Sequence, residues 1–309
     1  MRLPFFALTA LALVLAAGAP ARVARAAEPA PAIAFTFDDG LDPAAEPAAA
    51  RWNAEILAAL SRSGVKAMLF PAGRTGGTPG GLALTRAWGD SGHAIGNHTY
   101  SHRNLGSARM TVDEFGADVM RADSLFRVLP GFTPMLRFPY LKEGESAEKR
   151  DAFRAWMRAH GYRPAPVSVD ASDWWYSTRW RELERAGRAA DLPRLREAYV
   201  AHLWDRACYY DSLARAVLGR SPRHVLLLHT NAINAACVGD VIAHFRAHGW
   251  NVIAPAEAFA DPLYASEPAA VPAGESIVWS HARVAGAKGL RYPAEDGEYE
   301  APRLARLGL

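Results

Sequence analysis

Short apolar runs alternate along this chain with longer segments in which apolar residues recur at helical spacing. The short runs predict β-strands at residues 32–37, 65–70, 94–95, 135–138, 162–169, 225–229 and 251–254. The helically spaced segments predict helices at residues 48–63, 82–91, 111–129, 147–160 and 238–248. Strands and helices that alternate in this way indicate an α/β fold with a parallel sheet, either open or closed into a barrel.

Polar residues follow several of the predicted strands, at the point where each apolar run ends. They are Asp38 and Asp39, Arg137, Asp170 and Asp173, and His229. In parallel α/β folds the functional site lies at the carboxyl ends of the strands. These residues are therefore expected to meet at one end of the sheet.

The N-terminus has the pattern of a secretory leader. Arg2 precedes an uncharged, mostly apolar stretch, and Ala24-Arg25-Ala26 fits the small-x-small pattern of a cleavage site. The apolar stretch is about 15 residues long, shorter than the roughly 20 that a membrane-spanning helix needs. We therefore expect residues 1–26 to be a signal peptide. The mature protein would be exported, periplasmic or secreted, with no stable membrane anchor after cleavage.

Cleavage would also change the charge of the protein. The formal net charge is +3, and the loss of Arg2, Arg22 and Arg25 leaves 3 − 3 = 0. A neutral chain does not favour nucleic acid as a partner. Cys208 and Cys237 could form a disulfide in an oxidising compartment, or could remain two small buried side chains.

Asp38 and Asp39 place two like charges side by side, which raises the pKa of one of them unless a cation lies nearby. His98 and His102, four residues apart, would share one face of a helical turn, a spacing that suits two ligands of one metal ion. An Asp, His, His set leaves one coordination position open for water, as in catalytic zinc sites. Taken alone, the two histidines could equally be surface residues or hydrogen-bonded core residues.

Five ordered segments together resemble the polysaccharide deacetylase family, also described as the NodB-homology domain or carbohydrate esterase family four. Their sequences are Thr36-Phe37-Asp38-Asp39-Gly40, His98-Thr99-Tyr100-Ser101-His102, Arg137-Phe138-Pro139-Tyr140, Asp170-Ala171-Ser172-Asp173-Trp174 and Leu227-Leu228-His229. Each segment alone also has an ordinary structural interpretation. The complete ordered set implies a distorted (β/α)7 barrel and a metal-dependent hydrolase that removes N-acetyl groups from an amino-sugar glycan.

The resemblance also implies a role for each residue. Asp39, His98 and His102 would bind a divalent metal, most often zinc in this family. Asp38 would be the general base, held by Arg137, and His229 would be the general acid, paired with Asp173. The backbone N–H of Tyr140 would stabilise the oxyanion, Leu227 would line the acetyl pocket and Trp174 would form one wall of the substrate groove.

Some residues at the rim differ from the family pattern. Leu41 replaces a common proline, Leu141-Lys142 stands where glycine is usual, and Thr230-Asn231 stands where aspartate is common. These differences leave the chemistry intact but leave the substrate open: peptidoglycan, a chitin-like oligosaccharide or an exopolysaccharide. Two alternatives remain. One is a metallo-amidase or esterase acting on a small acylated molecule, and the other is a non-catalytic glycan-binding protein that kept the fold.

The predicted domain occupies residues 27–262, followed by a C-terminal extension at residues 263–309 that packs on the barrel or trails it. Residues 175–222 form a predicted helical insertion rich in aromatic residues. Aromatic faces can stack on sugar rings, but at helical spacing they pack a core more often, and we favour packing. We also expect the insertion to cover part of the substrate groove.

Overall fold

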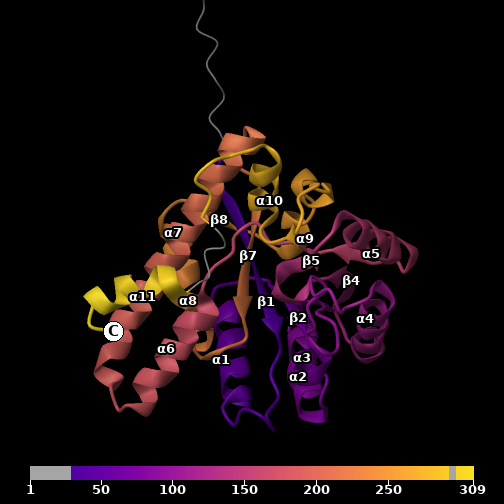
Figure 1. Cartoon of the computed structure of the whole chain (residues 1–309). Helices are drawn as coiled ribbons and strands as arrows, with labels where there is room; N and C mark the ends of the chain where they lie inside the picture. Colours follow the sequence, from indigo (N-terminus) through magenta and orange to yellow (C-terminus); the bar gives the residue numbers. More distant parts are fainter. Residues whose placement is uncertain (1–28, 292–296) are drawn as a thin grey trace, which may run out of the picture.

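The computed structural model describes residues 29–291 and 297–309, so the predicted signal peptide lies outside the described residues. A seven-stranded parallel sheet forms the centre of the molecule (Figure 1). Its strand order is β6-β4-β3-β2-β1-β7, and β8 pairs with the start of β1. The strands are β1 Ala32–Asp39, β2 Met68–Pro71, β3 Ala94–Asn97, β4 Phe132–Leu136, β6 Arg163–Pro164, β7 Arg223–His229 and β8 Asn251–Val252.

The sheet curls so that its two edges are linked. Strand β6 ends after two residues, because Pro164 and Pro166 cannot donate backbone hydrogen bonds to a neighbouring strand. The chain nevertheless stays extended, and Val169 forms a parallel bridge with Leu226 of β7. The predicted distorted α/β barrel is therefore confirmed as a curled parallel sheet, and one short segment connects its edges.

Most of the predicted helices are present close to their expected bounds. They are α1 Ala49–Arg62, α3 Pro79–Asp90, α4 Val112–Phe126, α5 Ala147–Ala159 and α8 Ala232–Ala247. A capping box forms at the start of α4, where Thr111 and Glu114 each bond the other's backbone. Helix α8 begins well before the predicted Val238, because the Asn231 side chain caps it by accepting the N–H of Asn234. Two short helices, α2 Gly73–Gly76 and α9 Pro255–Ala258, were not predicted.

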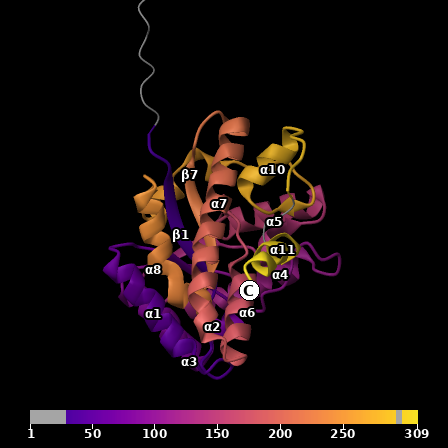
Figure 2. The same ribbon diagram turned by 90° about the vertical axis from the view of Figure 1, so that its left-hand side faces the viewer.

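The aromatic segment after the Asp173-Trp174 motif forms two long helices, α6 Asp173–Arg185 and α7 Leu192–Leu218. Figure 2 shows α7 running along one side of the barrel. Several of the aromatic residues are buried against the core: Tyr176, Trp180, Tyr199 and Tyr210. The expectation that these aromatics pack a core is confirmed. Cys208 and Cys237 do not form a disulfide.

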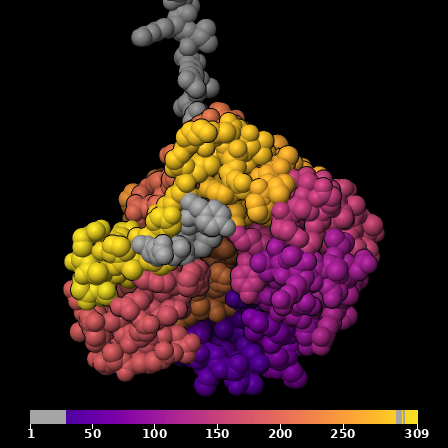
Figure 3. Space-filling model, viewed as in Figure 1, coloured from indigo at the N-terminus to yellow at the C-terminus, as the bar shows by residue number. Residues whose placement is uncertain are grey.

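The C-terminal segment packs on the barrel and on these helices. Strand β9 Ala273–Gly274 pairs with β5 Lys142–Gly144, and α10 Ile277–Val284 contacts α7. Helix α11 Gly297–Arg306 lies against α6 and α7 (Figures 1 and 2). In the space-filling view these C-terminal residues cover the upper part of the molecule and one flank (Figure 3). No helix among the described residues is both long enough and apolar enough to cross a bilayer.

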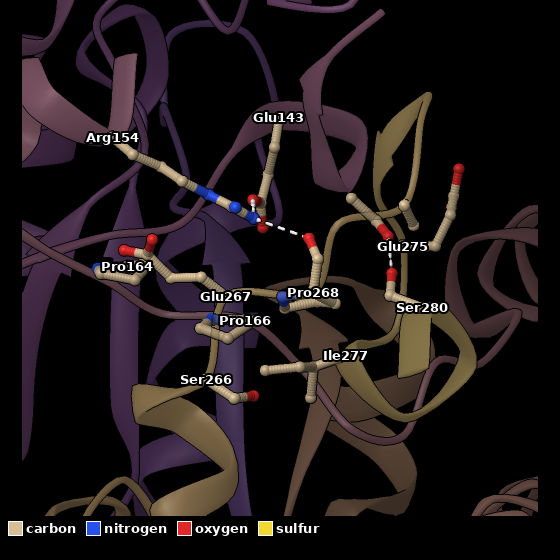
Figure 4. A pocket seen from close by; sticks show the side chains of 12 residues that line it. Glu143, Arg154, Pro164, Pro166, Ser266, Glu267, Pro268, Glu275, Ile277 and Ser280 are labelled. Atoms are coloured by element: carbon tan, nitrogen blue, oxygen red, sulfur yellow. Dashed lines mark hydrogen bonds and ion pairs between the residues drawn. The ribbon is translucent and has the colours of Figure 1, made fainter. Parts of the chain in front are cut away.

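A small cavity lies under this C-terminal segment. Arg154 reaches across it from α5, donating to Glu143 at 3.2 Å and to the carbonyl oxygen of Pro268 at 3.4 Å (Figure 4). The cavity holds about 20 Å³, which suits a single water molecule. It is too small to be a substrate site.

Candidate active site

A cavity of about 890 Å³ opens at the carboxyl ends of the strands. Residues of β1, β7, α6 and the loops after β2, β3 and β4 line it. Nearly all of the candidate residues reach it: Asp38, Asp39, His98, His102, Tyr140, Trp174, Leu227 and His229. Arg137 and Asp173 lie directly behind its wall, bonded to Asp38 and His229. The structure thus brings together every residue singled out from the sequence.

Three of these residues form a candidate metal site. Asp39, His98 and His102 each offer one ligand atom, and all three atoms lie within 4.8 Å of one another. The Nε2 atoms of His102 and His98 are 3.4 and 3.8 Å from Oδ1 of Asp39. His98 Nδ1 lies 2.8 Å from the carbonyl oxygen of Arg137, so Nδ1 carries the proton and Nε2 keeps a free lone pair. Two imidazole nitrogens and one carboxylate oxygen fit a zinc-type divalent cation with an open position.

The two histidines do not share a helical turn, as the spacing had predicted. They follow β3 in a loop, where Thr99 and His102 both have positive φ angles, +62° and +53°. This loop folds back so that the two imidazole ring centroids are 4.7 Å apart. A left-handed loop therefore brings the ligands together here, and the helical interpretation of the spacing is wrong.

Backbone strain is concentrated around this cavity. Within the described ranges, six non-glycine residues have positive φ: Asp39, Thr99, His102, Tyr140, Leu141 and Glu275. Asp39 ends β1, and the others except Glu275 lie in the segments that follow β3 and β4 at the candidate site. Such conformations cost of order 1–3 kcal/mol each and persist only where the surrounding structure holds them. These backbone conformations therefore lower the stability of the folded protein, and the surrounding structure holds them in place.

Asp38 is buried beside Arg137. Arg137 donates from Nη1 to both carboxylate oxygens, at 3.0 and 3.2 Å, and from Nη2 to Thr36 Oγ1 at 3.1 Å. Its Nε donates to the carbonyl oxygen of Ala165 at 2.6 Å, so the guanidinium is held on three sides. Burial raises the pKa of Asp38 to about 6, although the charge of Arg137 opposes this rise. A carboxylate with this pKa can accept a proton near neutral pH.

His229 lies beside Asp38 across the strand pair, because the two residues are partners in the β1–β7 register. Its Nδ1 is 2.7 Å from Oδ1 of Asp173, and its backbone N–H donates to the other carboxylate oxygen at 2.7 Å. Burial lowers the pKa of His229, but Asp173 outweighs burial and the net pKa is raised to about 10. The imidazole is therefore held as a cation that can donate a proton from Nε2.

The residues expected to contact substrate lie at the cavity wall. Trp174 is 45% exposed, so it is not a core residue, and Leu227 is buried with its side chain at the cavity surface. The Tyr140 ring lies over His102, with centroids 4.7 Å apart. Ser177 of α6 also lines the cavity, so the predicted helical insertion forms part of its wall.

Two asparagines that were not assigned a role also bond Asp173. Nδ2 of Asn231 donates to Asp173 at 3.0 Å, and Nδ2 of Asn234 donates at 2.7 Å. Arg74 adds a positive charge to the cavity rim. Asn231 had been noted only as a departure from the family pattern, and nothing in the local sequence pattern distinguished Asn234 or Arg74.

Comparison with known proteins finds similarity in the first half of this domain. Residues 25–165 match the model of the family described as polysaccharide deacetylase. Over this part of the chain, the match agrees with the resemblance seen in the ordered motifs. A peptidoglycan-N-acetylglucosamine deacetylase of Bacillus cereus is 33% identical over 143 residues, which cover 46% of this chain and 46% of that protein. The match thus spans about half the length of that curated relative.

Solved structures with similar folds are more distant in sequence. A family 4 carbohydrate esterase from Streptomyces lividans is 20% identical, with a TM-score of 0.49, over 74% of this chain and 95% of that one. A polysaccharide deacetylase from Bacillus cereus is also 20% identical, with a TM-score of 0.49, over 72% of this chain and 91% of that one.

Proposed function

We propose that this protein is an exported, metal-dependent hydrolase that removes N-acetyl groups from an amino-sugar glycan. One observation carries the proposal: the Asp39, His98 and His102 cluster shares a single cavity with a buried carboxylate, Asp38, and a partly buried imidazole, His229. Metal-assisted amide hydrolysis combines three functions in one place, namely a Lewis acid, a general base and a general acid.

Asp39, His98 and His102 would hold the divalent cation, with zinc the expected metal. When bound, such a cation lowers the pKa of a coordinated water from ~15.7 toward ~7 and polarises the acyl oxygen. Asp38 would accept the proton of the attacking water. Its Oδ2 is 3.7 Å from Nε2 of His98, so the base lies beside the ligand set. Arg137 would keep Asp38 oriented and ionised.

His229 would donate its Nε2 proton to the departing amine, while Asp173 holds the ring by its Nδ1–H. Protonation of the leaving group matters here, because an amine that is not protonated would have to leave as a strongly basic anion. The backbone N–H of Tyr140 would donate to the developing oxyanion, a contribution that is typically worth ~10²–10³-fold in rate.

The cavity wall supports a glycan as the substrate. Trp174 offers an exposed aromatic face on which a sugar ring can stack, and Leu227 offers a small apolar surface for the acetyl methyl group. The curated relative carries the name of an enzyme that acts on N-acetylglucosamine of peptidoglycan. We propose an N-acetylated glycan or oligosaccharide as the substrate, reached after export.

Two substitutions test the assigned roles. Asp38→Asn keeps the size and the ligand set but removes the base, so acetate release should fall below detection while bound zinc remains near one equivalent. His98→Ala removes a ligand, so both metal content and activity should be lost. Metal is measured by mass spectrometry after purification, and acetate by a coupled assay. If Asp38→Asn keeps wild-type turnover, the base is not Asp38.

A substrate screen separates the proposal from its alternatives. N-acetylglucosamine oligomers, peptidoglycan fragments and small acyl-amides are compared at equal acyl concentration. Faster acetate release from the glycans supports the deacetylase. A preference for the small amides would indicate a metallo-amidase, and glycan binding without any acetate release would indicate a non-catalytic binding protein.

A further inference from the structure

A chain of buried polar contacts connects the C-terminal helix α11 to the start of α6, where Asp173 lies. Glu300 of α11 is 4% exposed, and His202 of α7 is 1% exposed. Oε2 of Glu300 lies 3.2 Å from Nδ1 of His202 and accepts the hydroxyl of Tyr176 at 3.0 Å. Oε1 accepts Nη2 of Arg291 at 3.1 Å. Figures 1 and 2 show α11 beside the two long helices that carry these partners.

The other ring nitrogen of His202 bonds the backbone of Ser172, the residue that precedes Asp173. Nε2 of His202 accepts the N–H of Ser172 at 3.0 Å. Accepting this bond requires that Nε2 be unprotonated, so the ring proton sits on Nδ1 and is donated to Glu300. Burial lowers the pKa of His202 despite the neighbouring carboxylate, which agrees with a neutral ring. The carboxylate of Glu300 therefore selects the tautomer that can hold Ser172.

Ser172 directly precedes Asp173 and is the N-terminal cap residue of α6, where its own side chain makes no capping bond. An imidazole supplied by α7 thus holds the backbone at this helix start. A second residue of α7 reaches Asp173 through an asparagine: the hydroxyl of Tyr199 donates to Oδ1 of Asn234 at 2.6 Å, and Nδ2 of Asn234 donates to the Asp173 carboxylate. Two residues of α7 thus act on Asp173 indirectly, His202 through the neighbouring Ser172 and Tyr199 through Asn234.

We propose that Glu300 and His202 are positioning residues for the general acid: they fix Ser172, and thereby hold Asp173 against His229. The inference rests on the proposed function in one respect only, the role of His229 as the acid. It gives α7 and α11 a part in the chemistry besides covering the barrel.

The burial of Glu300 supports a positioning role over simple packing. Taking a carboxylate out of water is costly, and replacing buried ionic groups with apolar side chains of similar volume is often neutral or stabilising. Burial raises the pKa of Glu300, but the hydrogen bonds from His202, Arg291 and Tyr176 outweigh burial, and the net pKa is lowered. The chain therefore keeps a fully bonded charge where an apolar residue would have joined α11 to α6 and α7.

Three variants separate positioning from packing. Glu300→Leu keeps the volume but removes the acceptor for His202, whereas Glu300→Gln keeps an acceptor oxygen. Arg303→Leu is the matched control, because Arg303 also joins α11 to α7, through a surface ion pair with Asp205 at 3.2 Å. Each zinc-loaded full-length variant is assayed on N-acetylglucosamine oligomers and on 4-nitrophenyl acetate. The nitrophenolate leaves without needing a proton, so ester cleavage does not depend on the acid.

We expect Glu300→Leu to lower kcat on the glycan about tenfold or more, since general acid catalysis contributes ~10²–10⁴-fold. KM on the glycan and the rate on the ester should stay within about twofold, because neither depends on the acid. Glu300→Gln should keep most of the activity, and Arg303→Leu all of it. Unchanged kcat in Glu300→Leu, or equal losses on both substrates, would overturn the proposal.

A second measurement does not depend on turnover. Asp173, Asp39 and Asp38 are the charged groups that raise the pKa of the His229 ring. In chelator-treated protein, the NMR titration of His229 should move to lower pH in Glu300→Leu, because Asp173 is no longer held in place. Wild-type protein that releases no acetate from any glycan would refute the proposed function. An unmoved His229 titration would refute the positioning role, whatever the activity.

Discussion

Arg137 and Asp38 form a buried ion pair, so their contributions to the free energy of unfolding should be strongly coupled. Arg137 is fully buried, Asp38 is 2% exposed, and Nη1 contacts both carboxylate oxygens. Arg137→Met alone leaves a buried carboxylate without its cation, and Asp38→Leu alone leaves a buried guanidinium without its anion. Removing one partner of a buried pair costs about 3–5 kcal/mol of unfolding free energy.

The double variant removes both charges. Its free energy of unfolding should therefore fall by much less than the sum of the decreases in the two single variants. We expect a coupling energy of at least about 2 kcal/mol between the two positions. The hydrogen bonds from Arg137 to Thr36 and Ala165 are absent from both variants that lack the arginine. Their loss therefore cancels in the cycle, which isolates the contact with Asp38.

The assay is urea unfolding at pH 7 with chelator in every sample, so that metal binding adds nothing to the stability of any variant. The exposed pair of Arg51 and Glu55 on α1 serves as the control cycle. Its coupling should not exceed about 0.5 kcal/mol, as for other exposed helix pairs. If the losses at positions 137 and 38 simply add, the two charges do not depend on each other and the reasoning fails.

Three further outcomes follow from single side chains. Burial lowers the pKa of His93 to about 4, against ~6.5 in an unfolded chain, so the stability that it contributes is complete above pH 6.5 and declines as pH falls toward 4. The loss is about 3 kcal/mol, and urea unfolding of His93→Asn, which can still accept the Ala67 N–H, should decline less over that range. Gly96→Ala would place a Cβ 2.4 Å from the Phe70 ring and should cost about 1–3 kcal/mol by thermal unfolding. Gly239→Ala, whose Cβ would meet that of Ala59 at an ordinary contact distance of 3.8 Å, should not destabilise. Trp174→Ala should raise KM for glycan oligomers with little change in kcat, and an unchanged KM would show that this ring does not stack on the sugar.

The strands and the candidate metal ligands were predictable because their signals are local. The apolar runs that became β1 and β7 read as buried strands, and their carboxyl ends carry Asp38, Asp39 and His229. The five ordered motifs then predicted that these residues form one site, which no single apolar run indicates. The geometry of the histidine loop was not predictable in this way. Spacing alone cannot distinguish a helical turn from a loop with positive φ angles, because both bring residues i and i+4 together.

The contacts behind the site were also beyond prediction. Glu300 and His202 come from helices far apart in the sequence, and neither residue stands out from its neighbours by pattern. The same holds for Tyr199, which looked like one of many aromatics packing a core. Its ring does pack there, but its hydroxyl bonds Asn234. Periodicity predicts which face of a helix is buried and says nothing of the polar atom at the end of a buried ring.

The strained backbone around the cavity has a consequence for how the proposed activity would be lost. Asp39, His102, Tyr140 and Leu141 have positive φ angles. These residues would relax to more favourable backbone conformations if the packing around them weakened. Regions of this kind open at lower free energy than the core strands. Mild heat, denaturant or a distant destabilising substitution would therefore abolish turnover while the circular dichroism spectrum remains that of an intact barrel. Turnover, and not the melting temperature, is the sensitive gauge of damage to this protein.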